Sequence, residues 1–417
     1  MKFIYKFFIF YCFITILLSP IVLADDLSPV EDDFNVNEFM HDSNLQTNSA
    51  NDFPTINSRA YIVLDRKSNT VILGKNHNQR KKMASTTKIM TSLVVIENCN
   101  LSDTVEISKK AGGTGGSRLG LKTGDKITVN DLLYGLMLCS GNDAAVALAE
   151  HVAGSINNFS ELMNNKALEL GLTNTHFITP HGLDADEHYT TAYELAILSN
   201  YALKNETFAK IVGTKEYTIT INNNVKTIRN TNELLGNLNG VYGIKTGFTN
   251  GANRCLVTAC KRGDIDIICV VLGADTKKFR STDSIKLMEY AFSHFEYVDI
   301  NNIINTYFEN WKKEHLDTFS VYKGLYDYIS LTYDPPTYSN IPIKNDMLDK
   351  FNIIINCNTN LNAPITKGTI IGNITLLSGE TTIYSSNISV DCDIKKKNIT
   401  DYLILFYSNF RNLLVYK

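Results

Sequence analysis

Residues 83–90 read MASTTKIM and place a serine, Ser85, three positions before a lysine, Lys88. Apolar residues follow at helical spacing through Ile89 and Leu93, which predicts that a helix begins here. Side chains three positions apart lie on one face of a helix, so Ser85 and Lys88 can touch. A serine hydroxyl needs a nearby base to act as a nucleophile, and a desolvated neutral lysine is such a base. The alternative is a serine at a helix start beside a solvated lysine, because this spacing is common by chance.

Two further stretches have the residue types of a serine acyl-transfer site. Residues 138–145, LCSGNDAA, place Ser140 and Asn142 at a glycine break between helical segments. A hydroxyl and an amide at such a break suit proton relay and the holding of a peptide group. Residues 241–249, VYGIKTGFT, place a Lys-Thr-Gly run on a predicted strand. The run offers a positive charge, a hydroxyl donor and room for a substrate backbone at an extended edge.

The order Ser-x-x-Lys, Ser-x-Asn and Lys-Thr-Gly, on helix, helix and strand, resembles that of the serine penicillin-recognising enzymes. The stretches NTHFITPHGLD, HYTTAYELA and NTNELL resemble, more narrowly, the low-molecular-mass penicillin-binding proteins that are D-alanyl-D-alanine carboxypeptidases. The resemblance covers roughly residues 55–417. It implies an enzyme without a cofactor that removes the terminal D-alanine from the peptidoglycan pentapeptide and is acylated by penicillin.

The resemblance implies a catalytic role for four motif residues. Ser85 is implied as the acyl nucleophile and Lys88 as its base. Ser140 and Asn142 are implied to assist proton transfer and to hold the acyl amide.

The strand motif is implied to bind the substrate. Lys245 and Thr246 would lie near the leaving group, and Gly247 would let the substrate backbone approach. The backbone N–H groups of Ser85 and Phe248 are implied to form the oxyanion hole. The loss of one such donor costs about 3–4 kcal/mol of transition-state stabilisation.

Arg280, in DTKKFRSTD, aligns with a family arginine that assists recognition of the substrate's terminal carboxylate. A guanidinium suits this role because it binds a carboxylate in bidentate fashion. The alternative is a surface arginine at a helix start. The chain departs from the family at Thr231, where the resemblance would place a second arginine.

Residues 233–237, ELLGN, imitate the segment with which class A β-lactamases position a hydrolytic water. The match fails at the fourth residue and lies too close to the Lys-Thr-Gly strand, so we interpret it as accidental. Without that glutamate, a penicilloyl ester on Ser85 is expected to hydrolyse slowly.

The element pattern runs from strands through a block of helices to antiparallel strands, which predicts an α+β fold. By resemblance it is a β-lactamase/transpeptidase-like domain, an antiparallel sheet with a helical subdomain, followed by a small all-β domain and a C-terminal amphipathic helix. The predicted parts are a signal peptide (1–24), an acidic flexible spacer (25–54), the catalytic domain (55–297), a β-rich domain in which no helical pattern persists (298–395) and a membrane-anchoring helix (396–417).

Both ends of the sequence predict membrane-related functions. Two lysines, an apolar core and small residues before position 24 are typical of a secretory signal peptide; the alternative is an uncleaved anchor. The tail places Leu403, Phe406, Phe410 and Leu413 on one helical face, which favours a helix in a membrane interface over a packed C-terminal helix. The predicted location is the extracytoplasmic face of the cell membrane or the cell wall.

The composition, with 44% apolar and 20% charged residues and a net charge of −3, is that of a folded protein without a basic patch for nucleic acid. Cys12 lies in the signal segment, and the other cysteines are odd in number and widely spaced, which argues against a disulfide framework. Cys139 precedes Ser140, so thiol reagents are expected to impair activity. No metal site is expected, because the spacing of His151, His176, His181 and His188 fits no common ligand pattern. The stretch THFITPHGLD is instead predicted to be a structured loop stabilised by histidine hydrogen bonds.

Three functions remain open from the sequence. The first is a D,D-carboxypeptidase that acts on peptidoglycan stem peptides and is inhibited covalently by β-lactams. The second is a D,D-endopeptidase or a weak β-lactamase on the same scaffold. The third is a catalytically idle cell-wall-binding protein.

Overall fold

The computed structural model describes residues 34–42, 53–326 and 328–415. The predicted signal peptide, residues 1–24, lies outside the described residues. The chain divides into two compact units, Met1–Ser293 and His294–Lys417, and each is treated by itself.

The first unit is built on a five-stranded antiparallel sheet with the order β2-β1-β9-β8-β7. Short polar turns at residues 249–253 and 262–265 connect its last three strands, which are rich in β-branched residues. Among the described residues β7 pairs only with β8, so its other side is an edge of the sheet. The strands are β1 (Ala60–Asp65), β2 (Val71–Lys75), β7 (Val241–Thr249), β8 (Asn253–Arg262) and β9 (Ile265–Ala274).

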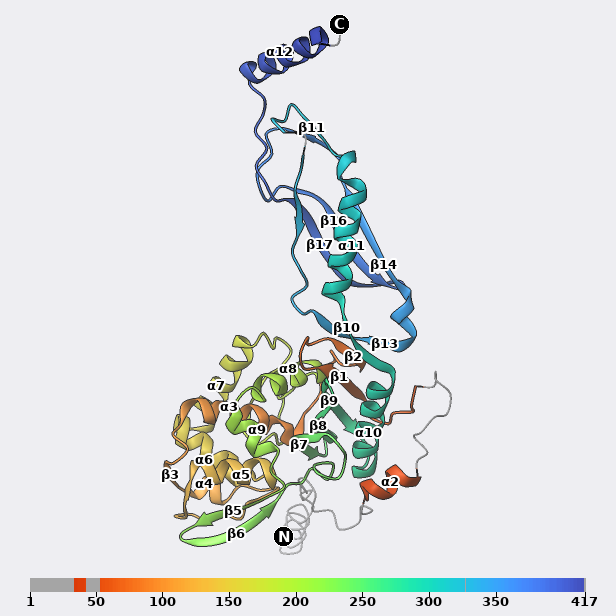
Figure 1. The fold of residues 1–417 in the computed structure, drawn as a ribbon. Coiled ribbons are helices and arrows are strands. Elements are labelled where there is room, and N and C mark those ends of the chain that lie inside the picture. The colour runs from red at the N-terminus through yellow and green to blue at the C-terminus, as the bar shows by residue number, and fades with distance from the viewer. Residues whose placement is uncertain (1–33, 43–52, 327, 416–417) are drawn as a thin grey trace, which may run out of the picture. The chain divides into compact units, whose positions relative to one another are not determined.

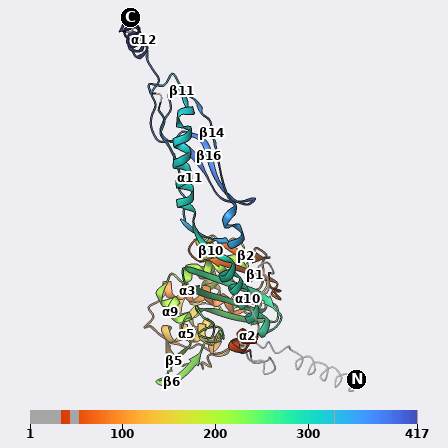
Figure 2. The same cartoon turned by 45° about the vertical axis from the view of Figure 1, so that its right-hand side comes forward.

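Helices cover both faces of this sheet. Helix α10 lies along one face in both views, and α8 packs against β1 and β9 on the other (Figures 1 and 2). Apolar side chains of α3 contribute to a core that extends into the helical subdomain. The helices are η1 (Ala84–Thr87), α3 (Lys88–Asn98), α4 (Lys109–Gly112), α5 (Val129–Leu138), α6 (Asn142–Ala153), α7 (Ile156–Glu169), α8 (Ala192–Ala202), α9 (Glu206–Val212) and α10 (Lys277–His294).

Two antiparallel strand pairs accompany the helices: β3 (Thr104–Glu106) with β4 (Lys126–Thr128), and the hairpin of β5 (Glu216–Ile221) with β6 (Asn224–Arg229). Neither the β3–β4 pair nor the β5–β6 hairpin was predicted from the sequence. The signal of the hairpin is present, since apolar and polar residues alternate about Asn222 and Asn223, which both have positive φ, 49° and 66°. Asparagine tolerates this conformation, and hairpin turns require it.

The segment expected as a flexible spacer, residues 25–54, contains a short helix, α2 (Val36–Asp42). The side chain of Asn35 accepts hydrogen bonds from the backbone N–H groups of Asn37 and Glu38, so it satisfies donors at the helix start. The prediction of a spacer without structure is therefore wrong for these residues.

The second unit contains a four-stranded antiparallel sheet, β12-β17-β16-β14, and two smaller strand pairs, β10 with β13 and β11 with β15. Its core consists of apolar residues from these strands and from helix α11. The elements are β10 (Phe295–Asp299), α11 (Ile300–His315), η2 (Leu316–Thr318), β11 (Ser320–Tyr322), β12 (Leu331–Tyr333), β13 (Asn340–Lys344), η3 (Asn345–Lys350), β14 (Phe351–Cys357), β15 (Asn360–Asn362), β16 (Ile370–Ser378), β17 (Thr381–Val390) and α12 (Ile399–Val415).

Helix α11 corrects the expectation that no helical pattern persists in residues 298–395. Ile300, Ile304 and Phe308 recur every four residues and are buried in the core of the unit. Asp299 caps the helix by accepting a hydrogen bond from the N–H of Asn302. The helical period was thus readable, but asparagine and charged residues fill the rest of this segment and obscured it.

Candidate active site

Ser85 and Lys88 meet at the junction of η1 and α3. Ser85 lies in the 3₁₀ turn and Lys88 is the first residue of the α-helix. The Nζ atom of Lys88 lies 2.8 Å from Oγ of Ser85, as the three-residue spacing predicts. Ala84, directly before the serine, has φ of 48°, a conformation that alanine rarely adopts and that often marks functional sites.

The amine of Lys88 is completely buried in a cluster of uncharged oxygen atoms. Besides Ser85 Oγ, it contacts Oδ1 of Asn142 and the backbone oxygen of His181, each at 2.8 Å. Three segments distant in the sequence therefore converge on this one nitrogen. The backbone contact from His181 is a feature that the sequence analysis missed.

Ser140 and Asn142 lie at the start of α6, on the glycine break that their sequence predicts. Ser140 is buried and has φ of 60°. Asn142 bonds Lys88 through its oxygen, while its Nδ2 donates to the backbone oxygen of Gly115 at 2.9 Å. Asn142 thus also orients the lysine, a contact beyond the implied role of holding the acyl amide.

Asp143 is a positioning residue that the sequence analysis did not identify. Its carboxylate is fully buried and accepts hydrogen bonds from the backbone N–H groups of Leu119, Gly120 and Leu121, at 2.8, 2.8 and 3.0 Å. These bonds hold residues 119–121 against the start of α6, beside Asn142. The signal that could have revealed it was an acidic residue directly before the apolar run of residues 144–149.

The Lys-Thr-Gly run lies on β7, directly against the nucleophile turn. A Cβ atom on Gly247 would lie 3.0 Å from the backbone nitrogen of Ser85, closer than side chains normally approach. Lys245 is buried, and its Nζ donates to the backbone oxygen of Thr246 at 3.1 Å. Phe248, the next residue on the strand, stacks its ring under Arg254, whose guanidinium carbon lies 4.0 Å from the ring centre. Because a Cβ at position 247 would lie so close to Ser85, glycine is needed there for the strand to approach the serine.

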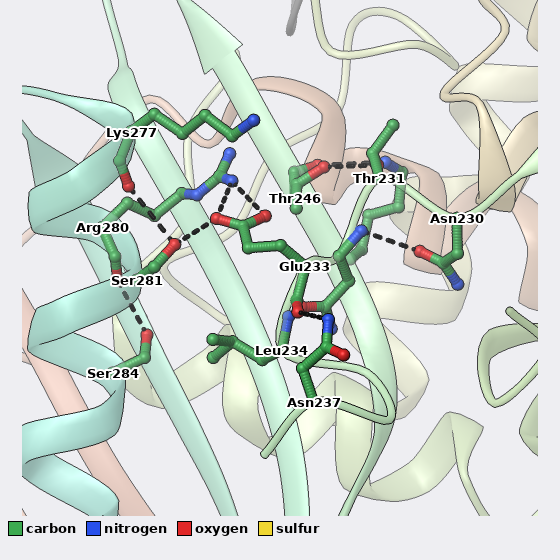
Figure 3. A network of polar contacts seen from close by, with 12 residues as sticks. Asn230, Thr231, Glu233, Leu234, Asn237, Thr246, Lys277, Arg280, Ser281 and Ser284 are labelled. Carbon is green, nitrogen blue, oxygen red and sulfur yellow. Dashed lines mark hydrogen bonds and ion pairs between the residues drawn. The ribbon is translucent and has the colours of Figure 1, made fainter. Parts of the chain in front are cut away.

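Arg280 is fully buried at the start of α10, so the alternative of a surface arginine is wrong. Its Nη2 donates to both carboxylate oxygens of Glu233, at 2.8 and 2.7 Å, and the hydroxyl of Ser281 also donates to Glu233. Figure 3 shows this contact beside a second one, between the hydroxyls of Thr231 and Thr246, 2.8 Å apart. Glu233 therefore engages Arg280, in keeping with the interpretation that its β-lactamase-like motif is accidental.

The histidines of residues 175–190 form hydrogen bonds within a structured loop, as predicted. Nδ1 of His188 accepts from the backbone N–H of Ile178 at 2.9 Å, which leaves its Nε2–H to donate to Oγ1 of Thr87 at 2.8 Å. Burial is the main cause that lowers the pKa of His188 to about 4 and that of His181 to about 3. Both imidazoles are thus neutral next to the nucleophile turn.

Acidification is expected to destabilise this unit. Between the ordinary pKa of 6.5 and the folded-state value of about 4, an unfolded chain binds a proton that folded His188 does not. The free energy of unfolding should then fall by about 1.4 kcal/mol per pH unit for each such histidine as the pH drops. Urea unfolding from pH 7.5 to 4.5 measures this slope. The slope should be smaller in His188→Gln and unchanged in the exposed control His151→Gln. An unchanged slope in His188→Gln would contradict the assignment of His188 as a buried neutral imidazole.

Cys139 is a poorly reactive thiol in this site. Its Sγ contacts the backbone oxygen of Gly135 at 3.3 Å, and burial, as the largest cause, raises its pKa to about 11. Since the thiolate is the reactive form, modification at neutral pH should be slow. The expectation that thiol reagents impair activity therefore applies only to slow or forcing alkylation.

Across the described part of the chain, no group of three or more histidine, cysteine or acidic residues is arranged to hold a metal ion. Within those same residues, no helix combines the length and apolarity needed to cross a membrane.

The fold and the site define a serine acyl-transfer enzyme of the penicillin-binding class. Residues 46–276 match the family model described as D-alanyl-D-alanine carboxypeptidase, and residues 311–396 match the C-terminal domain of penicillin-binding protein 5. The chain therefore belongs to the D-alanyl-D-alanine carboxypeptidase family and is a serine-type carboxypeptidase. The family resemblance and the predicted α+β fold with a C-terminal β domain are confirmed.

Individual relatives agree with this assignment. D-alanyl-D-alanine carboxypeptidase DacF of Bacillus subtilis is 35% identical over 352 residues, which cover 83% of this chain and 88% of the relative. DacA of Escherichia coli K12 is 33% identical over 376 residues, which cover 86% of this chain and 89% of the relative. Among solved structures, penicillin-binding protein 5 of Haemophilus influenzae gives a TM-score of 0.65 at 30% identity and covers 82% of this chain and 99% of its own.

Proposed function

We propose that this enzyme removes the terminal D-alanine from peptidoglycan stem pentapeptides through an acyl-enzyme on Ser85. The observation that carries the proposal is the 2.8 Å contact between Lys88 Nζ and Ser85 Oγ. Complete burial disfavours a charged ammonium and so favours the neutral amine, the form that a base requires.

In the proposed acylation step, Oγ of Ser85 attacks the carbonyl carbon of the penultimate D-alanine while its proton passes to Nζ of Lys88. The oxyanion that forms would be held by the backbone N–H groups of Ser85 and Phe248. Collapse of the intermediate breaks the peptide bond, and the leaving amine takes a proton by a route in which Ser140 would assist. Water then hydrolyses the ester and releases the shortened stem.

The remaining motif residues are proposed to bind the substrate. Its backbone would align with the edge of β7, which the absence of a side chain at Gly247 allows to lie directly against the nucleophile turn. The part of the substrate that carries the terminal carboxylate would bind Lys245, Thr246 and Arg280. Asn142 would hold both Lys88, the base, and the acyl amide of the substrate.

β-Lactams are proposed to acylate the same serine and to be released slowly. A glutamate that activates water for deacylation would have to face Ser85, whereas the carboxylate of Glu233 is bound by Arg280 and Ser281. The proposal therefore favours inhibition by penicillin over a β-lactamase activity.

Mass spectrometry of a pentapeptide digest tests the function. A loss of one D-alanine is expected, with little cleavage of cross-linked muropeptides and little turnover of penicillin. Preferred cleavage of cross-links would support the endopeptidase alternative, and rapid penicillin turnover would support the β-lactamase. Intact pentapeptide together with bound muropeptide would support a cell-wall-binding protein.

Export and membrane attachment are a further part of the proposal, as are the domain limits predicted from the sequence. Helix α12 exposes Leu403, Phe406 and Phe410, as an interfacial helix would. A chain ending at residue 398 should lose co-flotation with anionic vesicles. Equal flotation of both chains would contradict attachment through α12.

A further inference from the structure

One short segment before β7 engages both groups that are expected to receive the substrate's carboxylate. Thr231 contacts the hydroxyl of Thr246 at 2.8 Å, and two residues later Glu233 binds the guanidinium of Arg280. Figure 3 shows the two contacts together, with Glu233 extending toward α10 and Thr231 toward the strand. Residues 231–233 therefore contact both Thr246 and Arg280, the groups to which the proposal assigns the carboxylate.

The contact to Arg280 uses the chemistry of substrate recognition. Burial raises the pKa of Glu233, but the charge of Arg280 and hydrogen bonds from Ser281 and Arg280 outweigh it, so the pKa is below its usual range. Glu233 is thus an ionised carboxylate bound through both oxygens to one nitrogen of the guanidinium. A peptide's C-terminal carboxylate presents the same group.

The burial of the pair makes this contact more than a surface ion pair. The side chain of Arg280 is 0% exposed and that of Glu233 is 16% exposed. A charge withdrawn from water to this degree needs a counter-charge, and removing one partner of a buried pair is strongly destabilising. Glu233 supplies that counter-charge when no substrate is bound.

We propose that Glu233 is an internal stand-in for the terminal carboxylate and thereby sets the enzyme's selectivity for carboxylate-ended acyl donors. It holds Arg280 in place, and its negative charge opposes an arriving carboxylate. This inference rests on the proposed function, in which Arg280 recognises that carboxylate.

The proposal predicts the direction of a selectivity change. In Glu233→Gln the amide oxygen can still accept a hydrogen bond from Nη2, but the negative charge is gone. The pocket gains one net positive charge, which attracts an anionic terminus and leaves a neutral terminus unaffected. The ratio of kcat/KM for a carboxylate-ended donor to that for a neutral donor should rise by about tenfold, an energy that a single charge at partly buried sites readily supplies.

The experiment compares diacetyl-Lys-D-Ala-D-Ala with its C-terminal amide, both followed by mass spectrometry of the released product. The matched control is Glu216→Gln, which removes the same charge from an exposed pair with Arg229 in which the two side chains are 49% and 83% exposed. Glu233→Gln should raise the ratio, Glu216→Gln should not, and Glu233→Gln combined with Arg280→Gln should lose the gain.

Glu233→Asp provides a second variant if Glu233→Gln does not fold. It keeps the charge but is one methylene shorter, which loosens the contact to Nη2, so a smaller rise in the same ratio is expected. A purely structural role would change kcat/KM for both donors equally and leave the ratio constant. A role limited to orienting Arg280 would lower the ratio. Either result, in whichever variant folds, would overturn the proposal.

Arg280→Gln alone separates failure of this inference from failure of the proposed function. A lower ratio in Arg280→Gln with no rise in the Glu233 variants rejects only the stand-in role. An unchanged ratio in Arg280→Gln rejects carboxylate recognition by Arg280, and the inference with it.

Discussion

Replacement of Ser85 by alanine is expected to abolish both D-alanine release and acylation by penicillin. The variant lacks the atom that forms the ester, and Lys88 loses its contact with Oγ of Ser85. Loss of a serine nucleophile lowers kcat by about a millionfold in a serine protease. The measurements are D-alanine release from a pentapeptide and fluorescent penicillin bound after denaturation.

Ser92→Ala is the matched control for this variant. Ser92 is a buried serine on α3, the helix that follows Ser85, and its hydroxyl donates to the backbone oxygens of Lys88 and Ile89. Both variants should unfold in one cooperative step, and Ser92→Ala should retain acylation. Penicillin bound covalently to Ser85→Ala would show that another residue is the nucleophile.

Replacement of Lys88 by methionine is expected to slow acylation by about a hundred- to ten-thousand-fold, the usual contribution of general acid–base catalysis. Methionine fills a similar volume in the buried site but cannot accept the proton of Ser85. The measurement is the rate constant of acylation by penicillin, followed over time at saturating concentration.

Lys166→Met is the control. Lys166 lies on α7, where its amine forms ion pairs with Glu169 of the same helix and with Glu97 of α3. Its acylation rate should match that of the wild type. Rapid acylation of Lys88→Met would mean that a different group takes the proton of Ser85.

The elements nearest the reaction were the most predictable from sequence. Lys88 and Ser85 are three residues apart on one turn, so local geometry alone brings them together. The strand that carries Lys245 was readable because β-branched residues and short polar turns define its neighbours. Helix α11 and the β5–β6 hairpin were missed, although both have local signals.

The long-range contacts of the site were not predictable from a single sequence. Lys88 meets the backbone oxygen of His181 across 93 positions, and a backbone group leaves no signature in residue type. Arg280 meets Glu233 across 47 positions, and the sequence suggested only a misleading motif for Glu233. Such pairs arise from tertiary packing, which brings α10 and the segment before β7 together.

Mapping of the penicillin adduct tests the central claim most directly. The wild-type enzyme is incubated with penicillin, digested with protease, and its peptides are sequenced by mass spectrometry. The account predicts one penicilloyl group, on Ser85 within residues 83–88. An adduct on Ser140 or another residue, or no adduct at all, would contradict it.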